Sequence, residues 1–331
     1  MIYICGINFV IIVLRHSIKT VYMEKINNLY WNMRQDFYKK YREKIIPAVQ
    51  TYEKSRKIRL FWASIISSIF IAAGLFFVYA QFFIAKDSDC IKGAILFFGL
   101  FCAVWYGIKK DFENKVKKDV MPIVCSCFED LKWSQEGYYY GEFFSESGVI
   151  PTFHNESYDD IFTGSYKDVA IEIVESEYER GSGKSRHTVF GGVIIKLSMN
   201  KSFKSHTVVK PDSMLHISPK SGLKRTEFED PEFNKKFDVF TNDAVDARYL
   251  ITTSFMERLK NIKTAFKAKD ISCAFYKECF MLALSTNKDL FSICSLVKKI
   301  DDAEQYLQMY SEIESIIALI DHFKLDQNIG L

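Results

Sequence analysis

The chain has 331 residues, 48% of them hydrophobic and 26% charged, and its formal net charge at pH 7 is +3. This small value hides a strong asymmetry: residues 24–59 carry ten Lys and Arg against four acids, residues 93–118 carry five against two, and residues 119–331 carry 25 against 33. The net charges of these segments are +6, +3 and −8, and an acidic C-terminal part disfavours a nucleic-acid partner. About 200 residues remain there, enough for one sizeable core.

Residues 1–22 do not read as a cleaved signal peptide. Ile2–Leu14 is apolar, but it lacks a basic segment before it and a small-residue cleavage site after it, and 13 residues are short for a membrane span. We expect Met23 to be the biological start and residues 1–22 to be an upstream extension. The alternative is an interfacial segment.

Residues 23–59 predict an amphipathic helix that precedes the membrane. Its apolar residues recur every three or four positions, at Ile26, Tyr30, Met33, Phe37, Tyr41 and Ile45. The helix is expected either to rest on lipid headgroups or to pack on the C-terminal domain.

Two uncharged segments, residues 60–85 and 93–108, predict a transmembrane helical hairpin over residues 60–108. About 20 apolar residues of helix cross a bilayer, and Ile91 extends the second segment, so the spans are placed at 60–85 and 91–108. Lys and Arg flank the outer ends of the hairpin, whereas residues 86–92 balance two Lys with two Asp. Both chain termini are therefore expected to be cytoplasmic. The alternative is a buried hairpin of a soluble protein.

Small residues recur every four positions on each predicted span, a spacing that lets helix backbones approach closely in lipid. They are Ser64, Ser68 and Ala72 on the first span and Gly99, Ala103 and Gly107 on the second. We expect them to pack the two helices of one hairpin together; the alternative is homo-oligomerisation. Neither uncharged segment contains an ionisable residue, which argues against an ion pathway.

Residues 109–132 predict a basic connecting helix that Pro122 kinks or restarts. Residues 133–331 predict a cytosolic domain of several short strands, a helix capped by Ser254 and a last helix from near Asp301. Strands are predicted at 169–173, 189–197, 207–209, 237–240, 271–276 and 280–284. Strands outnumber helices without regular βα alternation, so we expect an α+β fold with a mainly antiparallel sheet and a C-terminal helix. About seven strands closed by that helix would also suit a pleckstrin-homology-like barrel.

Candidate chemical motifs in this domain are weak. Gly181-Ser182-Gly183-Lys184-Ser185 resembles the end of a phosphate-binding loop, but Tyr178 replaces the required first glycine and a strand pattern follows, so a solvated hairpin tip is expected. Cys125 and Cys127 lack a second pair for zinc, and the cysteines are expected to be free thiols. The glutamates at 172, 175, 177 and 179 predict a solvated strand face, with an acidic face for divalent cations or a basic partner as the alternative. The sequence therefore predicts no catalytic residue, no cofactor and no metal ligand.

One stretch resembles a known family. Residues 237–250 read Phe-Asp-Val-Phe-Thr-Asn-Asp-Ala-Val-Asp-Ala-Arg-Tyr-Leu and run into Thr252, Phe255-Met256 and Arg258-Leu259. This stretch is similar to the signature of a bacterial family of two-span membrane proteins known only as a domain of unknown function. Val189-Phe190-x-Gly192, Lys201-x-Phe203 and Thr207 to Asp212 are also similar to it, and Thr253 stands where proline is usual.

The resemblance covers roughly Met23 to Phe323. It implies a bacterial inner-membrane protein with a helical N-terminal segment, two spans and a mixed cytosolic domain, and it brings no catalytic residues.

Asp243, Asp246, Arg248 and Tyr249 form the candidate recognition or structural network of this stretch. In a turn between a strand and a helix, the two carboxylates and the guanidinium are expected to form a capping and ion-pair network. The functional alternative is that Arg248 and Tyr249 line a groove for an anionic ligand or peptide.

The sequence favours a non-catalytic, membrane-anchored binding, scaffold or regulatory module with a protein partner of unknown identity. The lipid bilayer is the other partner, with anionic headgroups expected near residues 34–59 and 109–118. The alternatives are a membrane-tethered, hydrolase-like enzyme and an oligomeric channel or transporter subunit.

Overall fold

This computed structural model describes residues 35–84, 88–128, 130–135, 137, 140–198, 204–213, 218–266, 268–286 and 290–323. The expected start at Met23, the extension 1–22 and the stretch Lys201–Phe203 lie outside these residues. Contacts divide the chain into two compact units. The hairpin unit is Met1–Val120 with Cys294–Tyr310, and the sheet unit is Met121–Ile293 with Ser311–Leu331.

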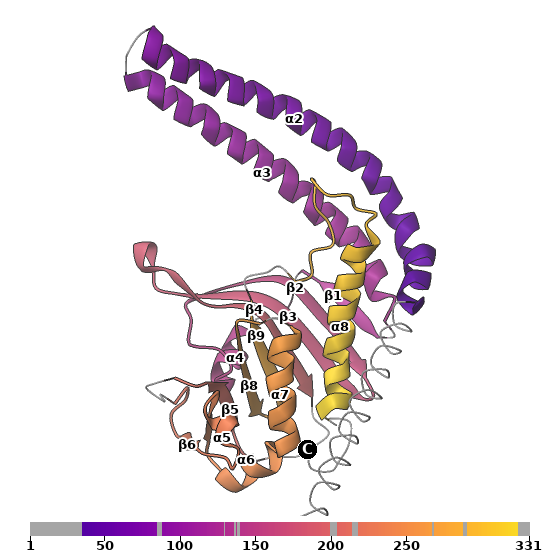
Figure 1. Ribbon diagram of the computed structural model, residues 1–331, viewed down its shortest axis with the longest axis vertical. Coiled ribbons are helices and arrows are strands. Elements are labelled where there is room, and N and C mark those ends of the chain that lie inside the picture. Colours follow the sequence, from indigo (N-terminus) through magenta and orange to yellow (C-terminus); the bar gives the residue numbers. More distant parts are fainter. Residues whose placement is uncertain are drawn as a thin grey trace, which may run out of the picture. The chain divides into compact units, whose positions relative to one another are not determined.

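The hairpin unit is built on two long helices that lie side by side (Figure 1). Residues 35–40 are helical and pass through the π-helical turn η1 (Tyr41–Ile45) into α2 (Ile46–Phe83), and α3 (Ser88–Cys125) returns. Near the tip, the rings of Phe77 and Phe97 stack with centroids 5.6 Å apart. Both helices are long and apolar enough to cross a membrane. They extend well beyond the uncharged segments because the helical periodicity continues on the charged sides.

The predicted small-residue stripes do not form the contact within the hairpin. Ser64, Ser68 and Ala72 are exposed, and so are Gly99, Ala103 and Gly107. The buried small residues of α2 are instead Ala63, Ser67 and Gly74. Neighbouring residues point about 100° apart around a helix, so a spacing of four does not by itself fix which face is buried. The expected role in hairpin packing is wrong, and homo-oligomerisation stays a prediction.

The helix before the span is covered by protein on its apolar side. Phe37 and Tyr41 are buried, and their rings lie 5.3 Å from Tyr310 and 5.7 Å from Tyr306, centroid to centroid. Tyr306 and Tyr310 belong to the first turns of α8 (Ala303–Phe323). Of the two alternatives, lipid headgroups or the C-terminal part of the chain, the helix packs on the C-terminal part, at the start of α8.

The helix α3 continues through Pro122 to Cys125. The expected restart at Pro122 is therefore wrong. Proline removes one backbone donor, and the carbonyl that it leaves, four residues earlier, belongs to the exposed residue Lys118, where water can satisfy it.

The sheet unit contains one nine-stranded sheet with antiparallel pairing throughout, which confirms the predicted α+β class. Its strands are β1 (Leu131–Ser134), β2 (Asn155–Tyr166), β3 (Val169–Arg180), β4 (His187–Ser198), β5 (Thr207–Pro211), β6 (Lys224–Thr226), β7 (Phe237–Thr241), β8 (Asp270–Tyr276) and β9 (Cys279–Ser285). Their order is β1-β2-β3-β4-β9-β8-β5-β7-β6. This open order, with β1 and β6 at the edges, differs from the pleckstrin-homology-like barrel of about seven strands.

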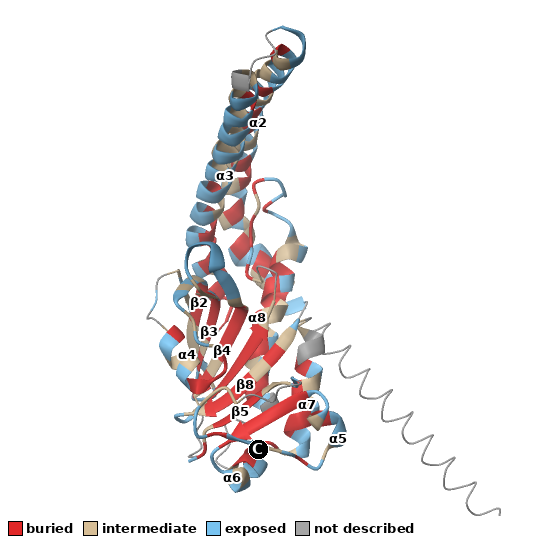
Figure 2. Ribbon diagram, turned by 90° about the vertical axis from the view of Figure 1, so that its left-hand side faces the viewer, coloured by how far each residue is buried: buried red, intermediate tan, exposed pale blue. Residues whose placement is uncertain are grey.

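The sheet buries both faces, as the red strands in Figure 2 show. Ala274, Met281 and Ala283 point to a core that includes Phe144 of α4 (Gly141–Ser147). Phe275 and Phe280 alternate with them and point the other way, where the Phe255 ring of α7 (Thr253–Ala265) lies 5.5 and 5.9 Å from theirs, centroid to centroid. Helices therefore cover the central strands on opposite faces.

The helix starts differ slightly from the prediction. Helix α7 spans Thr253–Ala265, and Thr252 rather than Ser254 caps it, since its Oγ1 accepts from Phe255 N at 3.3 Å. Helix α8 begins at Ala303, and Asp302 Oδ1 accepts from Glu304 N at 3.1 Å. A short helix α5 (Pro231–Asn234), which was not predicted, precedes β7.

The glycine-rich segment before β4 is an exposed hairpin tip. Gly183–Ser185 forms the single 3-10 turn η2 between β3 and β4, and all three residues are exposed. A phosphate-binding loop requires a following helix, and a strand follows here.

Gly192 is the position where the central sheet depends on glycine. Its φ is 146°, and an added Cβ would collide with the carbonyl oxygen of Leu284 on β9 and lie 2.9 Å from Thr286 N. We predict that Gly192→Ala lowers the free energy of unfolding by about 2–3 kcal/mol, since strain and the clash act together. Gly191→Ala is the matched control, because its Cβ would meet only Thr188 at 3.8 Å.

Denaturant unfolding of the two variants measures the difference. Equal loss of stability in both would contradict the assigned β4–β9 register.

Candidate functional site

The family-like stretch forms the junction between β7 and the short helix α6 (Ala244–Leu250). Asp243 is the N-cap of α6: its Oδ1 accepts from Val245 N at 2.9 Å and from Asp246 N at 3.1 Å. Carboxylates at this position satisfy backbone donors that the first turn leaves open. This is the geometry of the capping role expected for Asp243.

Asp246 and Asn242 bind the chain that enters β5. Asp246 Oδ2 accepts from Ser205 N at 2.9 Å, and Asn242 Oδ1 accepts from His206 N at 2.9 Å. The backbone N of Asn242 in turn donates to His206 O at 3.3 Å. The polar residues of the stretch therefore join two segments that lie about 40 positions apart in the sequence.

His206 is itself half-buried beside this junction. Its Nε2 lies 2.7 Å from Ser147 O, and its ring centroid lies 4.6 Å from that of Tyr276. Burial lowers the pKa of His206 below its ordinary value, which favours the neutral ring with Nε2–H as donor to the carbonyl.

Arg248 and Tyr249 are exposed on α6. Arg248 donates to Ala244 O at 3.2 Å and to Glu227 O at 3.4 Å, and its guanidinium lies 5.9 Å from the centroid of the Phe228 ring. In the described part of the chain it forms no ion pair with Asp243 or Asp246, because both carboxylates accept from backbone amides instead. The expected capping exists, and the expected ion pairs do not.

Tyr249 is 58% exposed, and Val245, one turn earlier on the same face, is 79% exposed. Neither side chain is needed for the local hydrogen bonds described above. They leave an apolar, solvent-accessible face beside the Arg248 guanidinium.

A cavity of about 460 Å³ opens over β2, β3 and β4, with Asp159, Glu175, Glu177 and Thr188 among its lining residues. Carboxylate oxygens of Asp159, Asp160 and Glu175 lie within 4.8 Å of one another. A register shift in β2 between Tyr158 and Ile161 places the two adjacent aspartates here. The sequence patterns singled out Glu175 but missed both aspartates, because such a bulge breaks the alternation.

These acids have structural partners. Asp160 accepts from Trp133 Nε1 at 2.6 Å, and Glu175 accepts from Leu290 N at 3.2 Å. The other glutamates of β3 bind β4 or its turn: Lys196 contacts Glu172, Thr188 contacts Glu177, and Arg186 contacts Glu179. The glutamates of this face therefore have hydrogen-bond or ion-pair partners within the sheet unit.

Among the described residues, no cysteine forms a disulfide bond. Burial raises the pKa of Cys125 to about 12 and raises that of Cys273 further. Their thiols stay protonated at neutral pH and are poor nucleophiles.

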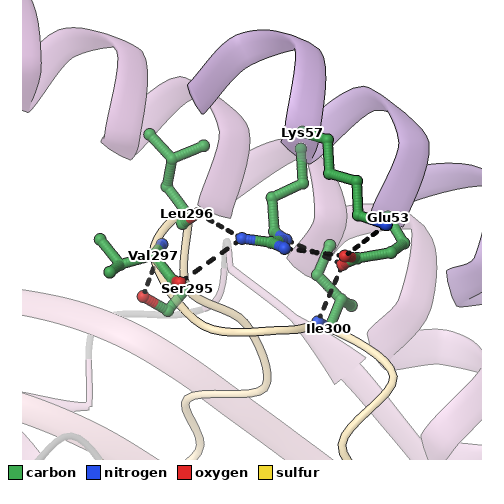
Figure 3. Close-up of polar contacts among 7 residues, drawn as sticks. Glu53, Lys57, Ser295, Leu296, Val297 and Ile300 are labelled. Carbon is green, nitrogen blue, oxygen red and sulfur yellow. Dashed lines mark hydrogen bonds and ion pairs between the residues drawn. The ribbon is translucent and has the colours of Figure 1, made fainter. Parts of the chain in front are cut away.

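A buried ion pair lies in α2, just before the first uncharged segment. Glu53 and Arg56 are 9% and 6% exposed. Arg56 Nε donates to Glu53 Oε2 at 2.8 Å, and its NH2 donates to Oε1 at 2.7 Å (Figure 3). Such a bidentate pair has a fixed geometry, since the planar guanidinium matches the carboxylate.

Residues 295–300, the loop that precedes α8, bind this pair in the hairpin unit. Arg56 NH1 donates to Leu296 O at 3.0 Å and to Val297 O at 3.4 Å, and Glu53 Oε2 accepts from Ile300 N at 3.3 Å (Figure 3). The two charges therefore hold both ends of one turn of backbone.

Helix α3 holds the same loop from a second point. Glu113 Oε1 accepts from Leu296 N at 3.4 Å, and its backbone oxygen accepts from Cys294 Sγ at 3.5 Å. The loop is thus fixed to both helices of the hairpin unit. We name it the clasped loop (residues 295–300).

This cluster was not predicted from the sequence. Its one local signal was an acid and an arginine three residues apart on a helix, a spacing that places them on one face. Nothing local indicated the clasped loop as their partner, about 240 positions later.

Comparisons with known proteins agree with a domain of unknown function. Residues 188–325 match the family model described as "Protein of unknown function (DUF3137)". This confirms the resemblance drawn from residues 237–250, although the match is shorter than the expected extent. No curated protein matches the chain.

One solved structure is similar at low level: the mycobacterial trehalose monomycolate transport factor A. The similarity has 8% sequence identity and a TM-score of 0.32, and it covers 56% of this chain and 86% of that one.

We predict that Arg56→Ala destabilises the hairpin unit by about 3 kcal/mol, because it leaves the Glu53 carboxylate buried without its bidentate partner and releases two loop carbonyls. Lys57→Ala is the control: Lys57 also contacts Glu53, at 3.8 Å, but its side chain is 69% exposed. That variant is expected to lose less than about 0.5 kcal/mol.

Thermal unfolding of the detergent-solubilised protein measures both. If Arg56→Ala unfolds at the same temperature as the wild type, the contact between Arg56 and the clasped loop does not stabilise the hairpin unit.

Proposed function

We propose that this protein is an integral membrane protein in which the hairpin of α2 and α3 spans a bilayer and the sheet unit is a non-catalytic binding or regulatory module. The observation that carries the proposal is the distribution of exposed apolar side chains. Of the 21 large apolar side chains that are exposed among the described residues, 18 lie between Ile58 and Tyr106. Figure 2 shows exposed residues along most of both helices.

Magnitudes favour lipid over water around these helices. A large apolar side chain gains about 2 kcal/mol on leaving water completely, so 18 half-exposed ones forgo on the order of 20 kcal/mol in water. The entire stability of a domain is only about 5–15 kcal/mol. Covering by lipid removes this cost, and the length of each helix suits a span.

Charge supports the proposed orientation. Lys54 and Lys57 precede the apolar part of α2, Lys109 and Lys110 follow that of α3, and all four are exposed. We place the protein in a bacterial inner membrane with two spans and both termini in the cytoplasm. Anionic headgroups near residues 34–59 and 109–118 would then face this basic charge.

Recognition is proposed for α6 in the sheet unit. Val245, Arg248 and Tyr249 form an exposed face that joins apolar side chains to a guanidinium, the combination enriched at protein interfaces. Asp243 and Asp246 are bound to backbone amides and have the role of shaping that face.

The topology has a direct test. Alkaline carbonate is expected to leave the protein in the membrane pellet. A green fluorescent protein fused after Leu331 is expected to be fluorescent, and alkaline phosphatase fused after Lys86 is expected to be active, since the two fusions lie on opposite sides of the membrane. Release by carbonate, or an inactive phosphatase after Lys86 together with a dark fluorescent protein after Leu331, would contradict the proposal.

Recognition by α6 is tested by affinity capture of the full-length protein from its own membranes, followed by mass spectrometry. We expect a bound protein to be lost in Arg248→Ala and kept in Arg258→Ala, an arginine on the neighbouring helix α7. Because Arg248 is exposed and makes only long hydrogen bonds, its removal should change the unfolding temperature by less than about 2 °C. A large fall in stability would assign Arg248 a structural role instead.

A further inference from the structure

Three exposed large apolar side chains lie outside the hairpin helices among the described residues: Val245, Tyr249 and Val297. Val297 is 61% exposed and belongs to the hairpin unit. It stands in the middle of the clasped loop, whose neighbours Leu296 and Ile300 are buried. The Val297 side chain is thus held in solvent by a loop whose backbone is fixed on both sides of it.

The clasped loop lies at the depth of lipid headgroups. Arg56 lies four positions before Leu60, where the first uncharged segment begins, and this is about 6 Å along a helix. Glu113 follows the last uncharged residue, Ile108, by five positions, or about 8 Å. The headgroup layer is about 5–8 Å thick on each side of the hydrocarbon core. Two independent helices therefore place the loop within that layer.

The charge of the loop suits the same environment. Lys298 and Lys299 are exposed, and residues 294–300 contain no acid. Lys54, Lys57 and Lys109 are exposed on the two helices near the ends of the uncharged segments. Arg59 differs from them, since Asp111 binds it at 2.5 Å. Lys57 also contacts Glu53, at 3.8 Å, so Lys54, Lys109, Lys298 and Lys299 are the cations of this group that remain available to a ligand.

We propose that the clasped loop is a membrane-interface element, in which Val297 enters the headgroup region and Lys298 and Lys299 bind the phosphates of anionic phospholipids. The inference rests on the proposed function, because it requires the hairpin to span the bilayer. Arg56, Glu53 and Glu113 are positioning residues, because their charged groups form hydrogen bonds with the backbone of the loop. A chain segment far from the spans in sequence thus becomes part of the lipid-binding surface.

Photo-crosslinking in lipid nanodiscs that contain phosphatidylglycerol tests the location. The full-length protein carries p-benzoylphenylalanine in place of Phe61, Val297 or Lys235, in three separate variants. Phe61 is 61% exposed in the first turn of the uncharged segment, and Lys235 is an exposed residue of the sheet unit. We expect lipid adducts at 61 and 297 and none at 235.

The outcomes separate the two proposals. No adduct at 61 would overturn the membrane hairpin itself. An adduct at 61 but none at 297 would overturn the interface loop and leave the hairpin in place. Equal adducts at all three positions would also overturn it, since the loop would then show nothing that an exposed site of the sheet unit lacks.

Titration of phosphatidylglycerol into the detergent-solubilised protein, followed by native mass spectrometry, tests the lysines. Each lysine near an anionic surface contributes about 1 kcal/mol, so Lys298→Gln/Lys299→Gln is expected to weaken lipid binding roughly 30-fold. Lys235→Gln/Lys236→Gln, an exposed lysine pair of the sheet unit, is the control and should bind as the wild type does. Equal weakening in both pairs, or none in either, would overturn the assignment.

Discussion

The buried ion pair of Glu53 and Arg56 is the interaction on which the hairpin unit depends. Its two charged side chains form hydrogen bonds with backbone groups of residues 296–300. Tyr306 and Tyr310, which follow these residues, pack against Tyr41 and Phe37 of the N-terminal helix. A charge pair taken out of water gains little by itself, but it is costly to break, so it fixes one arrangement and excludes others. The hairpin unit is therefore assembled from two segments, and in the sequence all nine strands of the sheet lie between them.

The family-like stretch gains a physical explanation from the fold. Asp243 caps α6, Asp246 and Asn242 hold the backbone that enters β5, and Asp238 is buried on β7 with Arg225 Nε at 2.7 Å from its Oδ1. Asp243, Asp246 and Asn242 accept from backbone amides that the strand–helix junction would otherwise leave unsatisfied, and Asp238 forms an ion pair with Arg225. Much of the signature thus describes how a junction is closed, and Arg248 and Tyr249 are the exposed side chains that remain.

The sequence predicted the elements that have a strong apolar pattern. Val169, Ile171 and Ile173 alternate in β3, the strands β4, β8 and β9 are largely apolar runs, and the helices α7 and α8 repeat apolar residues every three or four positions. The edge strands β1 and β6 are three or four residues long, and β2 is rich in polar residues and bulged, so each lacks a clear period of two. The two-residue turns at Lys167-Asp168 and Lys277-Glu278 have positive φ without glycine or asparagine, so they carried no hairpin signal.

The candidate sites were harder to predict for a different reason. Asp243 is local to its helix, and its cap could be read from three adjacent residues. The partners of Glu53, Arg56 and Glu113 arrive from residues 294–300, and those of Asp160 and Glu175 from Trp133 and Leu290. Charged residues in a sequence indicate only that a partner is needed, and the fold decides where it comes from.

The order of strands in the sheet has a consequence for biosynthesis. β4 pairs with β9 and β5 pairs with β8, so the hairpin of residues 270–285 joins the strands β1–β4 on one side to β5, β7 and β6 on the other. Translation of the 87 residues between the ends of β4 and β9 takes roughly 5–15 s at bacterial or eukaryotic rates. During that interval β4 and β5 present open hydrogen-bonding edges. The nascent chain is thus most exposed to aggregation after the hairpin helices have emerged and before residue 285 has, which is the stage at which a chaperone would matter most.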